Sequence, residues 1–309
     1  LRGQNRLVLG GSLHWIFQLE TIFSNLISGF LLEIFKKKDN NKKIALPISI
    51  LNETLEIDKS TKQSIPEYNT RILEAIKLLN VNKRDPMLNG ASIAEDLSIE
   101  SISLIEDIIN GSIMPSSSML SCFAEKYEID LDWLKTGCNT PFHKHCLTYT
   151  WAENAIQIYK EYKPKTVYIF TADVKEHFTA IAYQKTHYDF RIIHCESNWH
   201  LSSNGIGGTG QNQLVSLYKT MLFLNRFHTF THGKVVSEDE FFDLITGKCS
   251  VNILSHRLND YRWEDLLDLN LEPTEIAKRK QYYGDDFIEA QNIIKSKVSK
   301  DDYDFMNYV

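Results

Sequence analysis

The sequence predicts a multi-domain α+β protein, in which an all-helical domain precedes an α+β domain with a small, mostly antiparallel sheet. Two observations lead to this prediction. Between residues 67 and 137, apolar residues three or four positions apart alternate with serine, asparagine and glycine, as in short capped helices. After residue 165 the pattern changes to β-branched and aromatic runs followed by longer helical segments. The expected parts are an N-terminal segment 1–66, the helical domain 67–137, a linker 138–164 and a C-terminal domain 165–309.

The composition indicates a folded cytoplasmic protein. The chain has 309 residues, 43% of them hydrophobic and 24% charged, which is enough for about two or three domains with their own cores. Five cysteines, an odd number scattered over a long chain, indicate reduced thiols rather than a disulfide framework. The net charge of −6 excludes a global basic field that would draw the protein to nucleic acid. Any contact with DNA must therefore come from a local patch.

The first 66 residues are predicted to form one helix and a polar linker. Residues 13–35 are rich in Leu, Ile and Phe, but polar residues such as Gln18 and Glu20 interrupt a run that would need ~20 mostly apolar residues to span a membrane. Their three-four spacing favours an amphipathic helix packed on a partner surface. The charge run 36–43 is typical of a linker. We expect no membrane attachment.

Five short helices are expected between residues 67 and 137. The first three are 69–80 with Asn69 or Thr70 as its cap, 91–97, and 102–109 with Ser101 as its cap. The fourth covers 116–127 behind serine caps, and the fifth begins at Asp130 and is closed by Gly137. Only Ser98, Ile99 and Glu100 separate the second helix from the third. Two helices joined by so tight a turn can expose the second for insertion into a major groove.

A sequence motif closes this helical domain. Residues 115–137 contain Phe-Ala-Glu-Lys-Tyr and then Ile-Asp-Leu-Asp-Trp-Leu-Lys-Thr-Gly. This ending resembles the lambda-repressor-like (phage repressor, XRE-type) helix-turn-helix at about 69–137, and residues 93–111 match the family's second and third helices. The resemblance implies that Trp133 packs in the core and that the domain binds operator DNA as a dimer. It also implies core positions at Ala94, Leu97, Ile99 and Ile105.

The candidate DNA contacts lie in an acidic domain. They are Ser101, Ser103 and Glu106 for bases, and Arg71, Lys83 and Arg84 for phosphates. Residues 67–137 contain six basic and twelve acidic residues, a net charge of −6. Carboxylates repel phosphates, although they can accept a hydrogen bond from cytosine N4. A helix-turn-helix scaffold that contacts protein instead of DNA therefore stays open as an alternative.

The C-terminal domain is expected to combine a hairpin with several helices. The predicted strands are 166–172, 178–184 and 189–195, with a turn at 186–189 and a further short strand near 250–254. The predicted helices are 211–227, 237–246, 262–269 and 274–298. No sequence of the Gly-Asp-Ser-Met type precedes a distant lysine, so the self-cleavage of Ser-Lys phage repressors is not expected.

Three constellations in this half were considered as chemical sites. Residues 205–210 fit G-x-G-x-x-G, but they follow a hairpin, so a flexible glycine loop is expected, with a phosphate or nucleotide effector as the alternative. Cysteines and histidines gather within 138–146 at a spacing that matches no recognised zinc finger. His194 and Cys195 should point to opposite faces of a strand and cannot form a dyad. We therefore predict no catalytic residue, metal or cofactor.

Together these patterns predict a cytoplasmic DNA-binding transcriptional regulator, a phage-like repressor without self-cleavage. Its partners would be a double-stranded DNA operator and a second copy of the chain, because palindromic operators require a dimer. The C-terminal domain would dimerise or sense an effector. Two alternatives stay open. One is a protein-interaction module built on the acidic scaffold, and the other is an enzyme with its site in 165–255.

Overall fold

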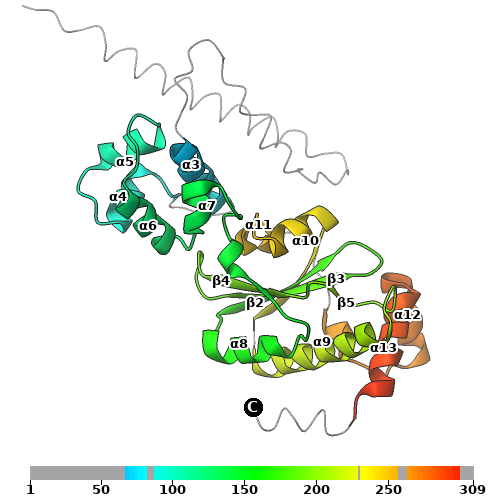
Figure 1. Cartoon of the computed structure of the whole chain (residues 1–309). Coiled ribbons are helices and arrows are strands. Elements are labelled where there is room, and N and C mark those ends of the chain that lie inside the picture. The colour runs from blue at the N-terminus through cyan, green and yellow to red at the C-terminus, as the bar shows by residue number, and fades with distance from the viewer. Residues whose placement is uncertain (1–66, 82–86, 229, 257–262, 300–309) are drawn as a thin grey trace, which may run out of the picture. The chain divides into compact units, whose positions relative to one another are not determined.

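The computed structural model describes residues 67–81, 87–228, 230–256 and 263–299 (Figure 1). The helix and linker predicted within residues 1–66 lie outside this part. The described residues combine helices with a six-stranded mixed sheet, so the α+β class predicted from the sequence is confirmed. None of the helices in these ranges has the length and apolar character needed to cross a membrane.

Residues 67–137 fold into five helices, at nearly the predicted positions. They are α3 (Glu67–Asn80), α4 (Gly90–Asp96), α5 (Ile102–Ile109), α6 (Ser117–Lys126) and α7 (Leu131–Thr136). The caps explain where they start and stop. Ser101, Ser116 and Asp130 each accept a hydrogen bond from the third amide of the following helix, and Gly137 ends α7 in the left-handed conformation. Trp133 and Ile105 are buried in the core between these helices, as predicted.

The sheet is mixed and its strand order is β1-β4-β3-β2-β6, with β5 paired to β3. The strands are β1 (Cys146–Thr148), β2 (Thr166–Ala172), β3 (Phe178–Gln184), β4 (Phe190–His194), β5 (Trp199–His200) and β6 (Thr231–Val236). The predicted hairpin strands β2, β3 and β4 pair antiparallel. However, β1 pairs with β4 in parallel and β6 with β2 in parallel. The sheet is therefore less antiparallel than the sequence indicated.

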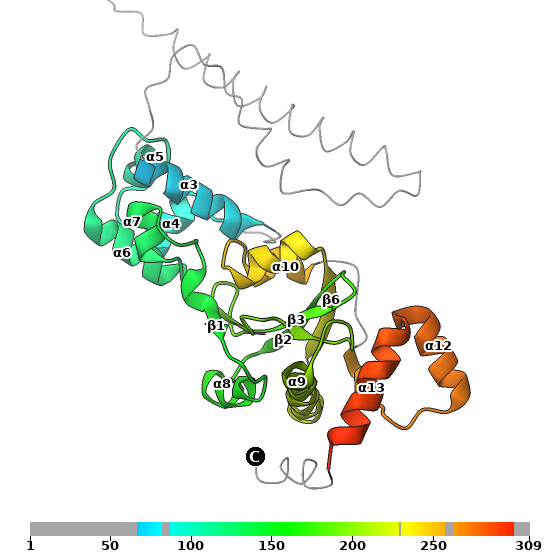
Figure 2. The same ribbon diagram turned by 45° about the vertical axis from the view of Figure 1, so that its right-hand side comes forward.

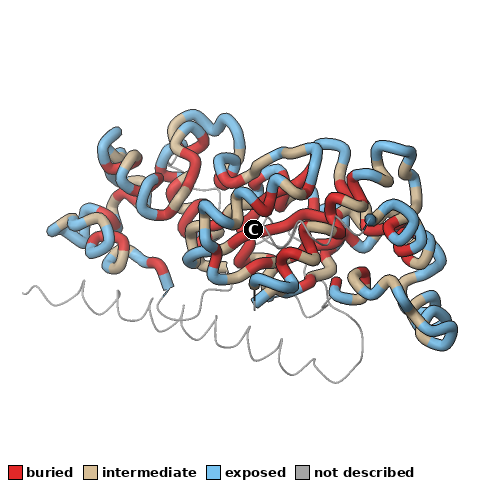
Figure 3. Tube along the Cα trace, turned by 90° about the horizontal axis from the view of Figure 1, so that it is seen from below, coloured by how far each residue is buried: buried red, intermediate tan, exposed pale blue. Residues whose placement is uncertain are grey.

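Helices cover both faces of the sheet (Figures 1 and 2). On one face lie α8 (Asn154–Tyr162) and α9 (Gly208–Phe227), and on the other α10 (Glu238–Ile245) and α11 (Val251–Ser255). Side chains alternate between the faces, so Val167 and Ile169 of β2 join the cluster under α9, whereas Phe170 joins the opposite cluster. Burial on both faces explains why the central strands β2, β3 and β4 are mostly apolar, whereas β1 and β6 are only partly buried. Figure 3 shows the buried residues in red.

The expected linker at 138–164 is instead largely structured. It contains a short 3-10 helix, η1 (His143–His145), the edge strand β1 and the helix α8. Ala155 and Ile156 of α8 are buried under the sheet. The many polar residues of this segment suggested a linker, but apolar side chains such as Phe142, Ala155 and Ile156 reach the core, whereas Trp151 stays exposed.

Three further predictions were wrong in the C-terminal half. The short strand expected near 250–254 is the helix α11, in which Val251 and Leu254 are buried on one side at helical spacing. The single helix expected at 274–298 is divided into α12 (Pro273–Tyr283) and α13 (Asp285–Lys297) by Gly284, which has a φ of 92°. The helix expected at 262–269 is limited to a 3-10 turn, η2 (Trp263–Leu266). Strands β1 and β6 were not predicted.

Candidate nucleic-acid interface

The turn between α4 and α5 is held by backbone and side-chain hydrogen bonds. Asn89 and Ser92 form a capping box at the start of α4, because each side chain bonds the backbone amide of the other. At its end, Ser98 adopts a left-handed φ of 55°, and the amide of Ile99 returns to the carbonyl of Ala94 at 2.8 Å. This closure turns the chain sharply and fixes the direction in which α5 leaves α4.

The candidate base-contacting residues lie on the exposed side of α5. The hydroxyl of Ser101 accepts from the amide of Leu104 at 3.3 Å and lies 2.9 Å from the hydroxyl of Ser103. Glu106 follows one turn later and is also exposed. Its side chain crosses the start of α4, where a Cβ atom on Gly90 would lie only 2.8 Å from the Glu106 Cγ. All three residues are therefore brought to one exposed helix.

The candidate phosphate-contacting residues are not gathered in the same way. The guanidinium of Arg71 is only 13% exposed and donates to the carbonyls of Leu134 and Lys135, at 2.8 and 3.0 Å. It thereby satisfies the last carbonyls of α7, which is a positioning role. Lys83 and Arg84 lie outside the described residues. Of the phosphate contacts proposed from the sequence, the structure therefore places Arg71 alone.

The surface around α5 is acidic and partly apolar. Residues 87–125 contain six Asp or Glu and no Lys or Arg. Ile102 and Leu104 of α5 are 47% and 38% exposed. Exposed isoleucine and leucine at the start of α5 offer contacts to a methyl group or an apolar side chain, and they offer nothing to a phosphate.

Asn69 has a role that the sequence did not predict. It was expected as the cap of the first helix, but α3 already begins at Glu67 and Asn69 is fully buried. Its amide nitrogen donates to the carbonyls of Ile108 and Ile113, at 2.6 and 2.8 Å. A buried asparagine thus ties the end of α5 to α3 and fixes the position of the exposed helix. The only sequence signal was a polar residue on the apolar face of α3.

His145 fixes the helical region to the sheet. Its Nε2 lies 2.6 Å from the carbonyl of Glu128, and its Nδ1 lies 2.7 Å from the carbonyl of Phe190 and 2.9 Å from a nitrogen of Arg191. Because a carbonyl only accepts and a guanidinium only donates, a neutral ring that donates from Nε2 to Glu128 accepts at Nδ1 from Arg191, and the Phe190 carbonyl then receives its hydrogen bond from Arg191 at 2.6 Å. Burial lowers the pKa of His145, and the nearby charges of Arg191 and Lys144 lower it further.

The cysteine and histidine group at 138–146 has other partners. Both ring nitrogens of His145 are engaged, and the thiol of Cys146 points to the carbonyls of Phe142 and Leu244. Burial raises the pKa of Cys146 to about 12, which disfavours the thiolate that a metal would need. Within the ranges that the structure describes, no group of three metal-ligating side chains converges.

The glycine loop and the histidine–cysteine pair have separate surroundings. Gly207 and Gly208 have open space where a Cβ would lie, so no close backbone approach requires them. Cys195 receives a hydrogen bond from the amide of Gln213 at 3.4 Å, whereas the Nε2 of His194 lies 3.2 Å from the hydroxyl of Thr148. The two residues thus contact different partners.

Comparison with known proteins gives no relative. No family model matches this chain, and no curated protein or solved structure does so.

Proposed function

We propose that helices α3 to α7 form a helix-turn-helix of the phage-repressor type, through which the protein binds duplex DNA as a transcriptional regulator. The observation that carries the proposal is the α4–α5 unit. A tight left-handed turn at Ser98 precedes a capped helix whose outer side carries Ser101, Ser103 and Glu106. A helix exposed in this way fits a major groove.

In this proposal α5 recognises DNA through hydrogen bonds to base edges and not through positive charge. The hydroxyl of Ser103 can donate or accept at base edges, and Glu106 accepts from cytosine N4. Lys83 and Arg84 contribute the phosphate contacts. A homodimer places two copies of α5 in half-sites about 34 Å apart on one face of the duplex, and the sheet region either dimerises or senses an effector.

The proposal is tested by selecting bound sequences from a random duplex pool with the full chain. We expect a palindromic consensus. If Lys83 and Arg84 of both subunits are the only phosphate contacts, the slope of log affinity against log salt is about −3.6. Enrichment of no sequence at low salt contradicts the proposal.

A matched pair of variants locates the contact on α5. Ser103→Ala with Glu106→Ala removes both polar side chains, and we expect loss of sequence preference at the contacted bases. Ser118→Ala with Glu125→Ala is the control, because Ser118 stands two residues after the cap Ser116 of α6 and both control residues are exposed. Equal specificity in the two double variants would place the contact elsewhere.

A second candidate function is a protein-interaction module on the same scaffold. It is favoured by the exposed Ile102 and Leu104 and by the lack of Lys and Arg in residues 87–125. Apolar side chains surrounded by carboxylates suit a partner with an apolar and basic face better than a phosphate backbone. A duplex selection without enrichment favours this candidate.

A further inference from the structure

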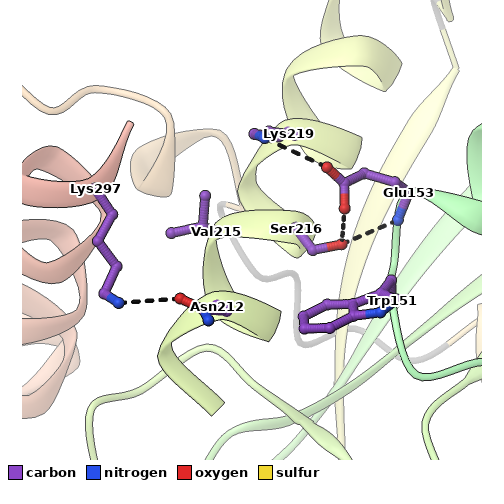
Figure 4. Close-up of a pocket in the computed structure, with 7 residues that line it drawn as sticks. All are labelled: Trp151, Glu153, Asn212, Val215, Ser216, Lys219 and Lys297. Atoms are coloured by element: carbon purple, nitrogen blue, oxygen red, sulfur yellow. Dashed lines mark hydrogen bonds and ion pairs between the residues drawn. The ribbon is translucent and has the colours of Figure 1, made fainter. Parts of the chain in front are cut away.

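A pocket lies on the face of the molecule where α9 meets the chain after β1. Its volume is about 350 Å³, within the range of about 300–1,000 Å³ that is usual for small-molecule sites. Figure 4 shows its lining, which comes from three elements: Trp151 and Glu153 before α8, Asn212, Val215, Ser216 and Lys219 of α9, and Lys297 at the end of α13.

One carboxylate of the pocket is already neutralised. Glu153 receives a hydrogen bond from the hydroxyl of Ser216 and pairs with Lys219 at 3.5 Å. The Ser216 hydroxyl in turn accepts from the backbone amide of Glu153 at 3.1 Å. This network fixes the wall between α8 and α9 and leaves Glu153 with little capacity to repel an anion.

The opposite wall carries a positive charge without a matching carboxylate. Lys297 donates to the neutral side-chain amide of Asn212 at 3.0 Å, and no acidic group of the described residues pairs with it. Asn212 is in the second turn of α9, near the positive end of that helix dipole, whereas Lys297 is the last residue of α13, at the negative end of its dipole. The unmatched charge at this wall is therefore that of the Lys297 ammonium itself. The pocket therefore favours a negatively charged group near Lys297.

Trp151 gives the pocket an aromatic wall. It is 40% exposed, whereas the other described tryptophans, Trp133, Trp199 and Trp263, are buried. Figure 4 shows its ring extending beneath Ser216 towards Asn212, with Val215 between Ser216 and Lys297. An exposed indole face can stack on a flat ring, and such contacts favour aromatic ligands.

We propose that this pocket binds a small aromatic anion, a single ring that carries a phosphate or carboxylate. The ring stacks on Trp151 and contacts Val215, and the anionic group receives hydrogen bonds from Lys297. The proposal does not rest on DNA binding, because none of the lining residues belongs to helices α3 to α7.

The test titrates phenyl phosphate into the full-length chain and follows the heat of binding. Inorganic phosphate supplies the charge without the ring, and benzyl alcohol the ring without the charge. Because both contacts contribute, we expect phenyl phosphate to bind about tenfold more tightly than either probe. Absence of measurable heat with phenyl phosphate at millimolar concentration would overturn the proposal, as would equal affinity for phenyl phosphate and inorganic phosphate.

Variants with matched controls assign the contacts. Lys297→Met should weaken phenyl phosphate about tenfold, whereas Lys278→Met should not, because Lys278 is an exposed lysine paired with Glu275 away from the pocket. Trp151→Leu should abolish the preference for phenyl phosphate over inorganic phosphate. Tyr282→Leu changes a tyrosine that is 70% exposed and should keep this preference. An unchanged thermal midpoint confirms that each variant folds. Equal binding by Lys297→Met and Lys278→Met overturns the assignment.

Discussion

The helical region 67–137 and the sheet region 146–297 differ in how far apart in the sequence the residues are that define their secondary structure. In the helical region, caps such as Ser101 and Asp130 bond to amides three residues later. In the sheet region, Val167 of β2 lies opposite Thr231 of β6, with a hairpin and the long helix α9 between them. Local chemistry therefore determines the first region, and long-range pairing determines the second.

The two regions nevertheless share a core. The apolar cluster under α10 and α11 continues into the helical region and includes both Phe123 and Phe170. Tyr127 packs edge-on against Tyr188 with ring centroids 5.2 Å apart, and the amide of Asp130 donates to the carbonyl of Pro141 at 2.8 Å. The two regions should consequently unfold together, although local capping defines the first and long-range strand pairing defines the second.

The largest expected effect comes from emptying this shared core. Phe123→Ala removes a fully buried ring and should lower the free energy of unfolding by about 3–5 kcal/mol. Denaturant titration followed by far-ultraviolet circular dichroism should show one transition at lower denaturant. Ile102→Ala, at a half-exposed side chain, is the control and should change stability by less than about 0.5 kcal/mol. Two separate transitions in Phe123→Ala would show that the regions unfold independently.

A smaller effect is expected at the buried asparagine of the helical region. Asn69→Ala leaves the carbonyls of Ile108 and Ile113 without their donor, which should cost about 1–3 kcal/mol in the free energy of unfolding. Hydrogen exchange should rise at the amides that follow α5. The matched change in the sheet region is Asn154→Ala, because Asn154 is exposed and donates to the single carbonyl of Trp151. Similar losses at both positions would argue against a special role for Asn69.

The caps give the next effect in size. Ser101→Ala should lower the free energy of unfolding by about 1 kcal/mol, because the amide of Leu104 loses its acceptor. Ser103→Ala serves as the comparison, since its hydroxyl caps no amide. Thermal unfolding of the two variants measures the difference. A larger loss in Ser103→Ala would mean that Ser103, and not Ser101, fixes the start of α5.

The smallest effect is a pH dependence at the junction of the two regions. Burial lowers the pKa of His145 below its ordinary value of 6.5, so the unfolded chain binds a proton more readily than the folded one. The stabilisation is complete above pH 6.5 and decreases as the pH falls below it. When the pH is lowered from about 7.5 to about 5.5, the thermal midpoint should decrease. The decrease should be smaller in His145→Gln. The exposed His143 provides the control, because His143→Gln should keep the full dependence.

Much of the candidate interface could be predicted because its parts are short in sequence. The turn at Ser98, the cap at Ser101 and the exposure of Ser103 and Glu106 lie within nine consecutive residues, and each follows from neighbours a few positions away. The role of Arg71 could not be predicted. An arginine on a helix surface and an arginine that caps the carbonyls of Leu134 and Lys135 have the same sequence pattern, and only the packing of α7 on α3 distinguishes them.

The sequence by itself determined the order of the five helices in residues 67–137, the hairpin strands β2 to β4 and the mixed α+β class, because caps, turns and periodicity act over a few residues. Tertiary structure alone decided that β1 and β6 join the sheet in parallel, that α8 replaces a linker, and that Trp151 and Lys297 line one pocket. The physical reason is that these pairings bring together residues far apart in the chain, where burial of the whole sheet outweighs the weak local preference of each short segment.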